Sequence, residues 1–94
     1  SKAGLLHLTQ AQALEWSRHG IRVNALAPGY IETDMNREFF QSEPGLRLIS
    51  RMPAKRLGRA SELDGALLLL ASDAGSFING SVITVDGAHL CSSL

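Results

Sequence analysis

The sequence predicts an α/β fold with a parallel sheet, and three observations support this. Two short segments, 21–27 and 81–85, have the alternating apolar or β-branched residues typical of strands. A leucine-rich helix is predicted between them, and a strand–helix–strand unit pairs its strands in parallel through a right-handed crossover. A Pro-Gly turn follows the first strand directly. Open α/β sheets bind ligands at this edge, beyond the carboxyl ends of their strands.

The first predicted strand is expected to be buried on both faces. One face of an extended segment would carry Ile21, Val23, Ala25 and Ala27. Leu26 adds apolar surface to the other face, as in a parallel sheet covered on both sides. Pro28 ends the strand because it has no N–H to donate, and Gly29 permits close approaches that a side chain would block.

The residues before this strand predict a long helix. Positions 1–19 contain no proline and are rich in helix formers, and Gly20 follows as a helix stop. The apolar stripe of this helix is wider than a one-sided surface helix needs, so we expect contacts with more than one partner. His7 and His19 are interpreted as surface or capping residues, since no companion ligands stand at a metal-binding spacing.

Between the strands, segment 34–59 consists of two short amphipathic pieces with Pro44-Gly45 between them. Next to a ligand turn, such a segment is typical of a hinged helical lid over a substrate site, and plain connecting helices are the alternative. The following residues, Ser61 to Asp64, match a capping box in which Asp64 reaches back to the start of the helix. The helix should continue to about Ser72 with its leucines deeply buried.

Composition limits the possible partners. The 94 residues fit one domain at most, and a formal net charge of zero gives no electrostatic case for nucleic acid or an acidic membrane surface. No apolar run approaches the length of a membrane span. The single Cys91 cannot form an internal disulfide, which favours a reducing cytoplasm.

Two strands cannot shield each other's edges, so we expect the 94 residues to be a fragment of a larger fold.

Five short motifs stand in a consistent order along almost the whole chain. They are Ser1-Lys2-Ala3-Gly4, IRVN with its Pro-Gly turn, Ile31-Glu32-Thr33, Arg-Leu-Gly at 56–58, and ING-SVITVDG at 78–87. Together they resemble the carboxyl-terminal half of a short-chain dehydrogenase/reductase. The resemblance implies that residues 1–94 are the C-terminal portion of one doubly wound, parallel-sheet Rossmann domain.

The resemblance also implies a catalytic and cofactor site. Lys2 matches the lysine of the family's Tyr-x-x-x-Lys pair, whose tyrosine would lie four residues earlier, and Lys2 would also contact the ribose of NAD or NADP. Pro28 and Gly29 match the turn that lies against the nicotinamide. Main-chain groups of Ile31 and the hydroxyl of Thr33 would contact the carboxamide or, for Thr33, the pyrophosphate. No metal site is implied.

Several side chains near this turn allow more than one interpretation. Thr33 can also cap the helix that follows, a role compatible with cofactor contact. Asn24 is interpreted as a structural hydrogen-bonding residue. Four apolar or aromatic residues are candidates for lining the substrate pocket, or equally for packing the core or lid: Tyr30, Met35, Phe39 and Phe40.

The implied activity is hydride transfer between NAD(P) and a small alcohol or carbonyl compound. The family's glycine-rich turn and catalytic tyrosine have no counterpart in this sequence, so we expect the isolated chain to be inactive. Ala88 stands where many members have a second glycine, a change that should leave the strand intact. Members form homodimers or homotetramers, and the alternative to an enzyme is therefore a non-catalytic assembly module that retains those surfaces.

Overall fold

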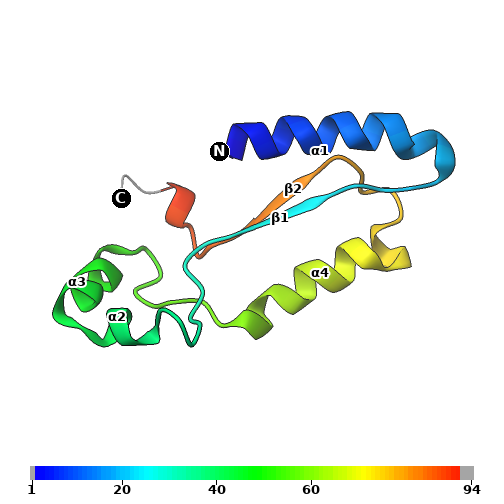
Figure 1. Cartoon of the computed structure of the whole chain (residues 1–94). Helices are drawn as coiled ribbons and strands as arrows, with labels where there is room; N and C mark the ends of the chain where they lie inside the picture. Colours follow the sequence, from blue (N-terminus) through cyan, green and yellow to red (C-terminus); the bar gives the residue numbers. More distant parts are fainter. Residues whose placement is uncertain (1, 92–94) are drawn as a thin grey trace. The chain divides into compact units, whose positions relative to one another are not determined.

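A computed structural model describes residues 2–91, which fall into two compact units. The first unit contains residues 2–27 and 64–84, and the second contains 28–63 and 85–91. Ser1 of the first sequence motif lies outside the described residues. Figure 1 follows the elements along the chain. Among residues 2–91, no helix is long and apolar enough to cross a membrane.

The long predicted helix is confirmed. Helix α1 spans Lys2–Trp16, and a 3₁₀ turn, η1, continues it over Ser17–His19. Gly20 adopts the left-handed conformation, with φ at 72°, and its N–H donates to the Ser17 carbonyl. A glycine reaches this conformation without the steric cost that a side chain imposes, and so it ends the helix where the sequence predicted.

The two strands form a parallel pair, as predicted. They are β1, Ala25–Pro28, and β2, Val82–Val85. The Ala25 N–H donates to the Ser81 carbonyl at 2.9 Å, and the Gly29 N–H donates to the Val85 carbonyl at 3.1 Å. The offset between donor and acceptor is the same in both bonds, which fixes a parallel register.

Strand β1 is shorter than predicted because polar side chains occupy the main-chain groups just before it. The Val23 N–H donates to the Asn79 side chain at 2.9 Å. Asn24 donates through Nδ2 to the Ile78 carbonyl and accepts from the Ser81 N–H, both at 2.9 Å. The residues just before β1 are therefore joined to the β2 side mainly by side-chain bonds, with one main-chain bond from the Gly80 N–H to the Val23 carbonyl at 2.8 Å. The structural role expected of Asn24 is confirmed.

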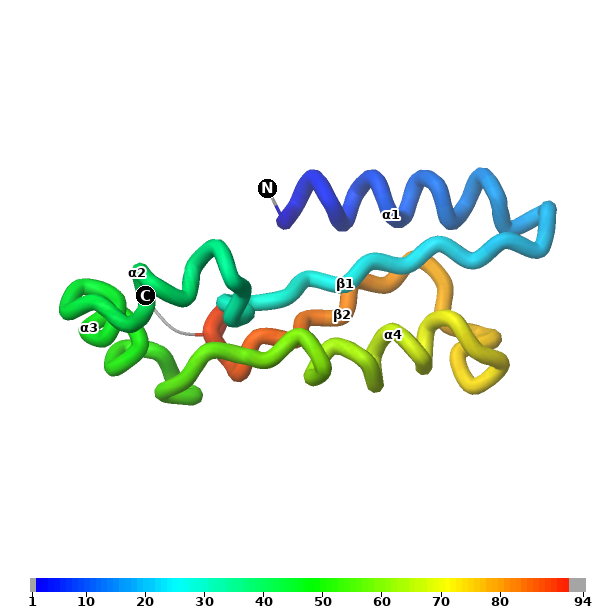
Figure 2. The backbone as a smooth tube through the Cα atoms, turned by 60° about the horizontal axis from the view of Figure 1, so that its bottom comes forward, coloured from blue at the N-terminus to red at the C-terminus, as the bar shows by residue number. Residues whose placement is uncertain are grey.

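The burial expected from the apolar sequences is wrong for these described residues. Helix α4 spans Asp64–Ala71, and Leu68 on it is 66% exposed. On α1, Leu14 is 82% exposed, and both strands are only partly buried. Figures 1 and 2 show α1 and α4 on opposite sides of the strands. A two-stranded sheet is too narrow to cover the apolar surface that these helices present.

The helical segment of the second unit differs from the expected hinge. It contains α2, Arg37–Gln41, and α3, Glu43–Arg51. Pro44 and Gly45 lie within the first turn of α3 and not between two helices, because proline is well suited to that turn. Ser42 is the junction, and its hydroxyl accepts from the Gly45 N–H at 3.3 Å.

The predicted capping box is displaced toward the amino end. A 3₁₀ turn, η2, covers Ala60–Leu63 before α4 begins. The carboxylate that reaches back belongs to Glu62, which accepts from the Arg59 N–H at 2.9 Å. The role expected of Asp64 is therefore wrong, because the extra 3₁₀ turn moves the start of the helical structure. Two further 3₁₀ turns are η3, Asp73–Gly75, and η4, His89–Cys91.

Candidate functional site

The turn after β1 is shaped by a close approach of the main chain. The Gly29 N–H is bonded to the Val85 carbonyl, which brings Asp86 against the glycine. A Cβ placed on Gly29 would lie 2.6 Å from the Asp86 Cβ and 2.9 Å from its Cα. The close approach expected at Gly29 is therefore present, and the residue that approaches it is Asp86, in the same unit.

Ile31 is held by a parallel bridge to Gly58. The Gly58 N–H donates to the Tyr30 carbonyl, and the Glu32 N–H donates to the Gly58 carbonyl, each at 2.8 Å. The Arg-Leu-Gly motif at 56–58 therefore pairs with the turn that follows β1. This pairing fixes the main chain on both sides of Ile31, one of the expected cofactor contacts.

Thr33 and Asn36 form a reciprocal cap at the start of the helical segment. The Thr33 N–H donates to Asn36 Oδ1 at 2.8 Å, and the Asn36 N–H donates to Thr33 Oγ1 at 3.2 Å. The Asn36 side chain also donates to the Ile31 carbonyl at 2.8 Å. The Thr33 hydroxyl therefore caps the turn at 34–36, whereas the N-cap residue of α2 itself is Asn36. A hydroxyl that accepts one bond can still donate another. Sequence reasoning missed Asn36, although its spacing from Thr33 is that of a capping box.

Arg56 and Glu62 form the best-defined ion pair of the second unit. Two guanidinium nitrogens of Arg56 donate to the two carboxylate oxygens of Glu62, at 2.7 and 2.8 Å. The hydrogen bond from Arg56, and then the one from the Arg59 N–H, lowers the pKa of Glu62 to about 2. The same bond raises the pKa of Arg56. The carboxylate is therefore ionised at any ordinary pH.

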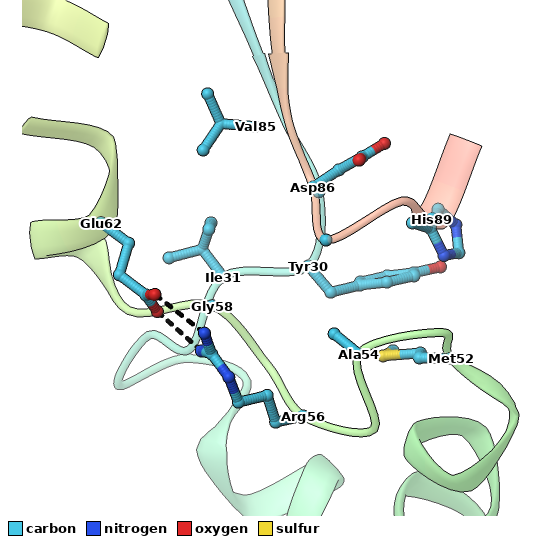
Figure 3. Close-up of a pocket in the computed structure, with 12 residues that line it drawn as sticks. Tyr30, Ile31, Met52, Ala54, Arg56, Gly58, Glu62, Val85, Asp86 and His89 are labelled. Carbon is cyan, nitrogen blue, oxygen red and sulfur yellow. Dashed lines mark hydrogen bonds and ion pairs between the residues drawn. The ribbon is translucent and has the colours of Figure 1, made fainter. Parts of the chain in front are cut away.

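These residues surround a small pocket of about 80 Å³ in the second unit (Figure 3). Ile31, Gly58, Arg56 and Glu62 lie along one part of it, and Asp86 and His89 along another. The Tyr30 ring points toward His89. The centroids of these two rings are 5.1 Å apart in an edge-to-face arrangement. The pocket combines an aromatic surface with charged groups.

Only one of the four candidate pocket residues lines this space. Tyr30 lines it and also makes an edge contact with Phe40, with ring centroids 5.8 Å apart. Phe40 is 7% exposed and belongs to the core of the helical segment. Met35, 97% exposed, and the half-exposed Phe39 are not among the lining residues. The core-packing alternative therefore holds for Phe40.

Lys2 lies in the first unit, whereas Pro28, Gly29, Ile31 and Thr33 follow one another in the second. Its ammonium group donates to Thr84 Oγ1 on β2 at 2.6 Å. Sequence reasoning did not identify Thr84. Within residues 2–91, no cluster of three His, Cys, Asp or Glu side chains could hold a metal ion.

Comparison with known proteins agrees with this architecture. The family described as enoyl-(acyl carrier protein) reductase matches residues 1–88. Gluconate 5-dehydrogenase of Gluconobacter oxydans is 43% identical over 88 residues, which cover 93% of this chain and 34% of that protein. The 2-dehydro-3-deoxy-D-gluconate 5-dehydrogenase of Escherichia coli is 41% identical over 91 residues, 96% of this chain and 36% of the enzyme.

A solved structure extends the likeness to three dimensions. The gluconate 5-dehydrogenase of Burkholderia cenocepacia, in complex with NADP and tartrate, superimposes with a TM-score of 0.84 at 40% identity. The match covers 97% of this chain and 36% of that one. The chain therefore belongs to the short-chain dehydrogenase/reductase family and has part of its Rossmann-type α/β fold. It spans about a third of the length of these relatives, not the half that the motifs suggested.

Proposed function

We propose that this chain is the carboxyl-terminal part of an NAD(P)-dependent oxidoreductase that interconverts an alcohol and a carbonyl by hydride transfer. The observation that carries the proposal is the fixed turn after β1. Hydrogen bonds with Gly58 and with Asn36, some donated and some accepted by them, hold this turn on both sides of Ile31 and at Thr33. The names of the relatives, which include gluconate 5-dehydrogenase and galactitol 2-dehydrogenase, favour a polyhydroxylated substrate.

The chemistry of this turn fits the nicotinamide end of the cofactor. The bound cofactor would supply the hydride acceptor or donor. Ile31 would contact its carboxamide through main-chain groups, and Thr33 would contact the carboxamide or pyrophosphate through its hydroxyl. Such neutral groups satisfy an amide or a phosphate oxygen without adding charge. The cap from Asn36 orients the Thr33 hydroxyl before any ligand arrives.

Lys2 is proposed to hold the cofactor ribose and to activate a tyrosine four residues before it in a longer polypeptide. Residues four apart lie on the same face of a helix, and an ammonium group beside a phenol favours the phenolate. The tyrosine would then exchange a proton with the substrate oxygen. The bond to Thr84 uses one of the three ammonium donors and anchors the lysine against β2.

Cofactor titration tests the division of labour in this proposal. The 94-residue chain alone should show no saturable NADH or NADPH fluorescence change in the micromolar range, because the glycine-rich pyrophosphate turn is not part of its sequence. A polypeptide that adds the preceding segment should bind one of the two cofactors. Micromolar binding of either cofactor by the 94-residue chain would contradict the expectation that binding requires the preceding segment.

Replacing Lys2 tests its catalytic role. In the longer polypeptide, Lys2→Ala should lower kcat by at least about 100-fold, the scale of general acid–base catalysis. The thermal unfolding temperature should change little because the Lys2 side chain is exposed. Arg18→Ala, an exposed cation beyond the other end of the same helix, is the matched control and should keep its activity. Undiminished turnover in Lys2→Ala would rule out the assigned role.

The apolar exposure of α1 favours a second proposal, assembly into a homodimer or homotetramer. Leu8 and Leu14 are exposed on this helix, and such surface is typical of an interface or of contact with other parts of the fold. Analytical ultracentrifugation of the chain with and without Leu14→Lys distinguishes these cases. A monomer in both samples would contradict the assembly module.

A further inference from the structure

The helical segment 34–59 is closed at its base by main-chain bonds. Gly58, at the end of the segment, donates to Tyr30 and accepts from Glu32, just before its beginning. Asn36 adds a side-chain bond to the Ile31 carbonyl. Any displacement of Gly58 must therefore move the residues on both sides of Ile31, or else break these bonds.

One carboxylate holds the chain on both sides of Gly58. Glu62 accepts hydrogen bonds from two guanidinium nitrogens of Arg56, which lies two residues before Gly58. It also accepts from the Arg59 N–H, one residue after Gly58, at 2.9 Å. In Figure 3 this ion pair lies beside Gly58 and Ile31. Three charge-assisted bonds thus converge on the Glu62 carboxylate and hold the chain on either side of Gly58, the residue that pairs with the turn.

The geometry distinguishes this pair from an ordinary surface ion pair. Arg47 and Glu43 on α3 make a single contact at 3.2 Å, with side chains 66% and 85% exposed. Exposed pairs of that kind contribute little to stability. Arg56 and Glu62 are 52% and 39% exposed, and their contact is bidentate and extended by a main-chain donor. Bidentate geometry within a network is the case in which a surface pair has an effect.

We propose that Arg56 is a positioning residue for cofactor binding. Through Glu62 it holds Gly58 against the turn and keeps Ile31 in place for the nicotinamide. The inference rests on the proposed function. Arg56 itself makes no contact with the cofactor in this proposal, so its loss should weaken cofactor binding while leaving the chemical step intact.

The test uses the longer oxidoreductase and whichever of NADH or NADPH it binds. Arg56→Ala should raise the cofactor Kd and KM by about tenfold, with kcat at saturating cofactor changed by less than about twofold. Arg56→Lys should raise Kd by about threefold, because an ammonium group cannot make the bidentate contact. Arg47→Ala, which removes the other ion pair of the same segment, should stay within about twofold of the wild type.

Amide hydrogen exchange tests the mechanism independently of any cofactor. The Glu32 and Gly58 N–H groups should exchange faster in Arg56→Ala and Arg56→Lys, and at the wild-type rate in Arg47→Ala. Unchanged exchange and unchanged Kd in the Arg56 variants would overturn the inference. If Arg56→Ala lowers the folded fraction, Arg56→Lys decides by the same two measurements. A wild-type protein that binds neither cofactor would contradict the proposed function, while the exchange experiment would still test the pair.

Discussion

Each of the two units of this chain is stabilised internally by a different kind of interaction. In the first, polar side chains bridge residues far apart in sequence: Arg22 donates to the carbonyls of Gly75 at 2.7 Å and Ile78 at 3.3 Å. Its helices meanwhile leave leucines exposed. In the second, short-range caps, an ion pair and edge-to-face aromatic contacts tie loops around a pocket.

This difference separates a framework from a binding surface. The first unit has the regular elements of the α/β fold and apolar faces suited to further layers of protein. The second unit fixes irregular chain without a large core. Loops of this kind carry function because a scaffold positions them, and so their order depends on a few specific bonds.

The largest expected effect contrasts one helical glycine from each unit. A Cβ on Gly45 would lie 2.1 Å from the Phe39 carbonyl oxygen, whereas one on Gly65 would meet nothing within 4 Å. Gly45→Ala should therefore destabilise the protein by about 3 kcal/mol through overpacking. Gly65→Ala should stabilise it by up to about 1 kcal/mol through helix propensity. Denaturant unfolding measures both, and equal effects would erase the contrast.

A smaller loss is expected from the polar bridges of the first unit. Asn24→Ala removes the partner of the Ser81 N–H and the shorter of the two bonds to the Ile78 carbonyl, which keeps Arg22, and this should cost about 2 kcal/mol. Asn79→Ala removes one exposed bond, to the Val23 N–H, and should cost less, about 1 kcal/mol. Urea unfolding of both variants tests this order. A reversed order would show that the Asn24 amide does not hold the start of the strand.

A gain is expected at the turn after β2. Ala88 has φ at 69°, in the left-handed region, directly after Gly87 at 60°. Ala88→Gly should stabilise the protein by about 1 kcal/mol, because only a residue with a side chain suffers strain there. Ala88→Val should destabilise it, since a branched side chain fits this conformation worst. Thermal unfolding should show shifts in opposite directions, and a common direction would contradict the strain.

The smallest effect concerns acid stability of the second unit. The pKa of Glu62 is lowered from 4.5 to about 2, so its ion pair stabilises the folded state above pH 4.5. That contribution is lost as the pH falls through about 2, where the folded carboxylate becomes protonated. The free energies of unfolding of the wild type and of Glu62→Gln should therefore differ at pH 6 and converge near pH 2. A constant difference would contradict the coupling.

Local sequence signals predicted the elements that depend on local chemistry. Gly20 ends α1, the β-branched run at 81–85 forms β2, and Thr33 caps the segment after the turn. The spacing from Ser61 predicts the capping carboxylate at Asp64, but in the structure Glu62 takes this role, three residues after Arg59, because a 3₁₀ turn precedes α4. Such competition between neighbouring residues cannot be resolved from spacing alone.

Properties set by distant neighbours were not predictable in this way. The leucines of α4 predicted burial, yet burial depends on which layers lie against a helix, and the strands of this chain do not cover it. Arg22 gave no sequence signal, since its acceptors are carbonyl groups, which every residue carries. The Ile31–Gly58 bridge likewise joins positions with no complementary side chains.

Because the bridge joins Ile31 to Gly58, the chain between these two residues can be exchanged as one segment. Because the ends are already adjacent, a longer or shorter excursion adds little closure entropy, about 0.6 kcal/mol for each doubling of length. The sequence and length of this segment can therefore diverge while the two bridge residues, Ile31 and Gly58, stay fixed. For enzyme engineering, a graft between Glu32 and Gly58 would exchange the helices but would have to keep Thr33 and Arg56, which lie between these boundaries and are proposed to contact or to position the coenzyme.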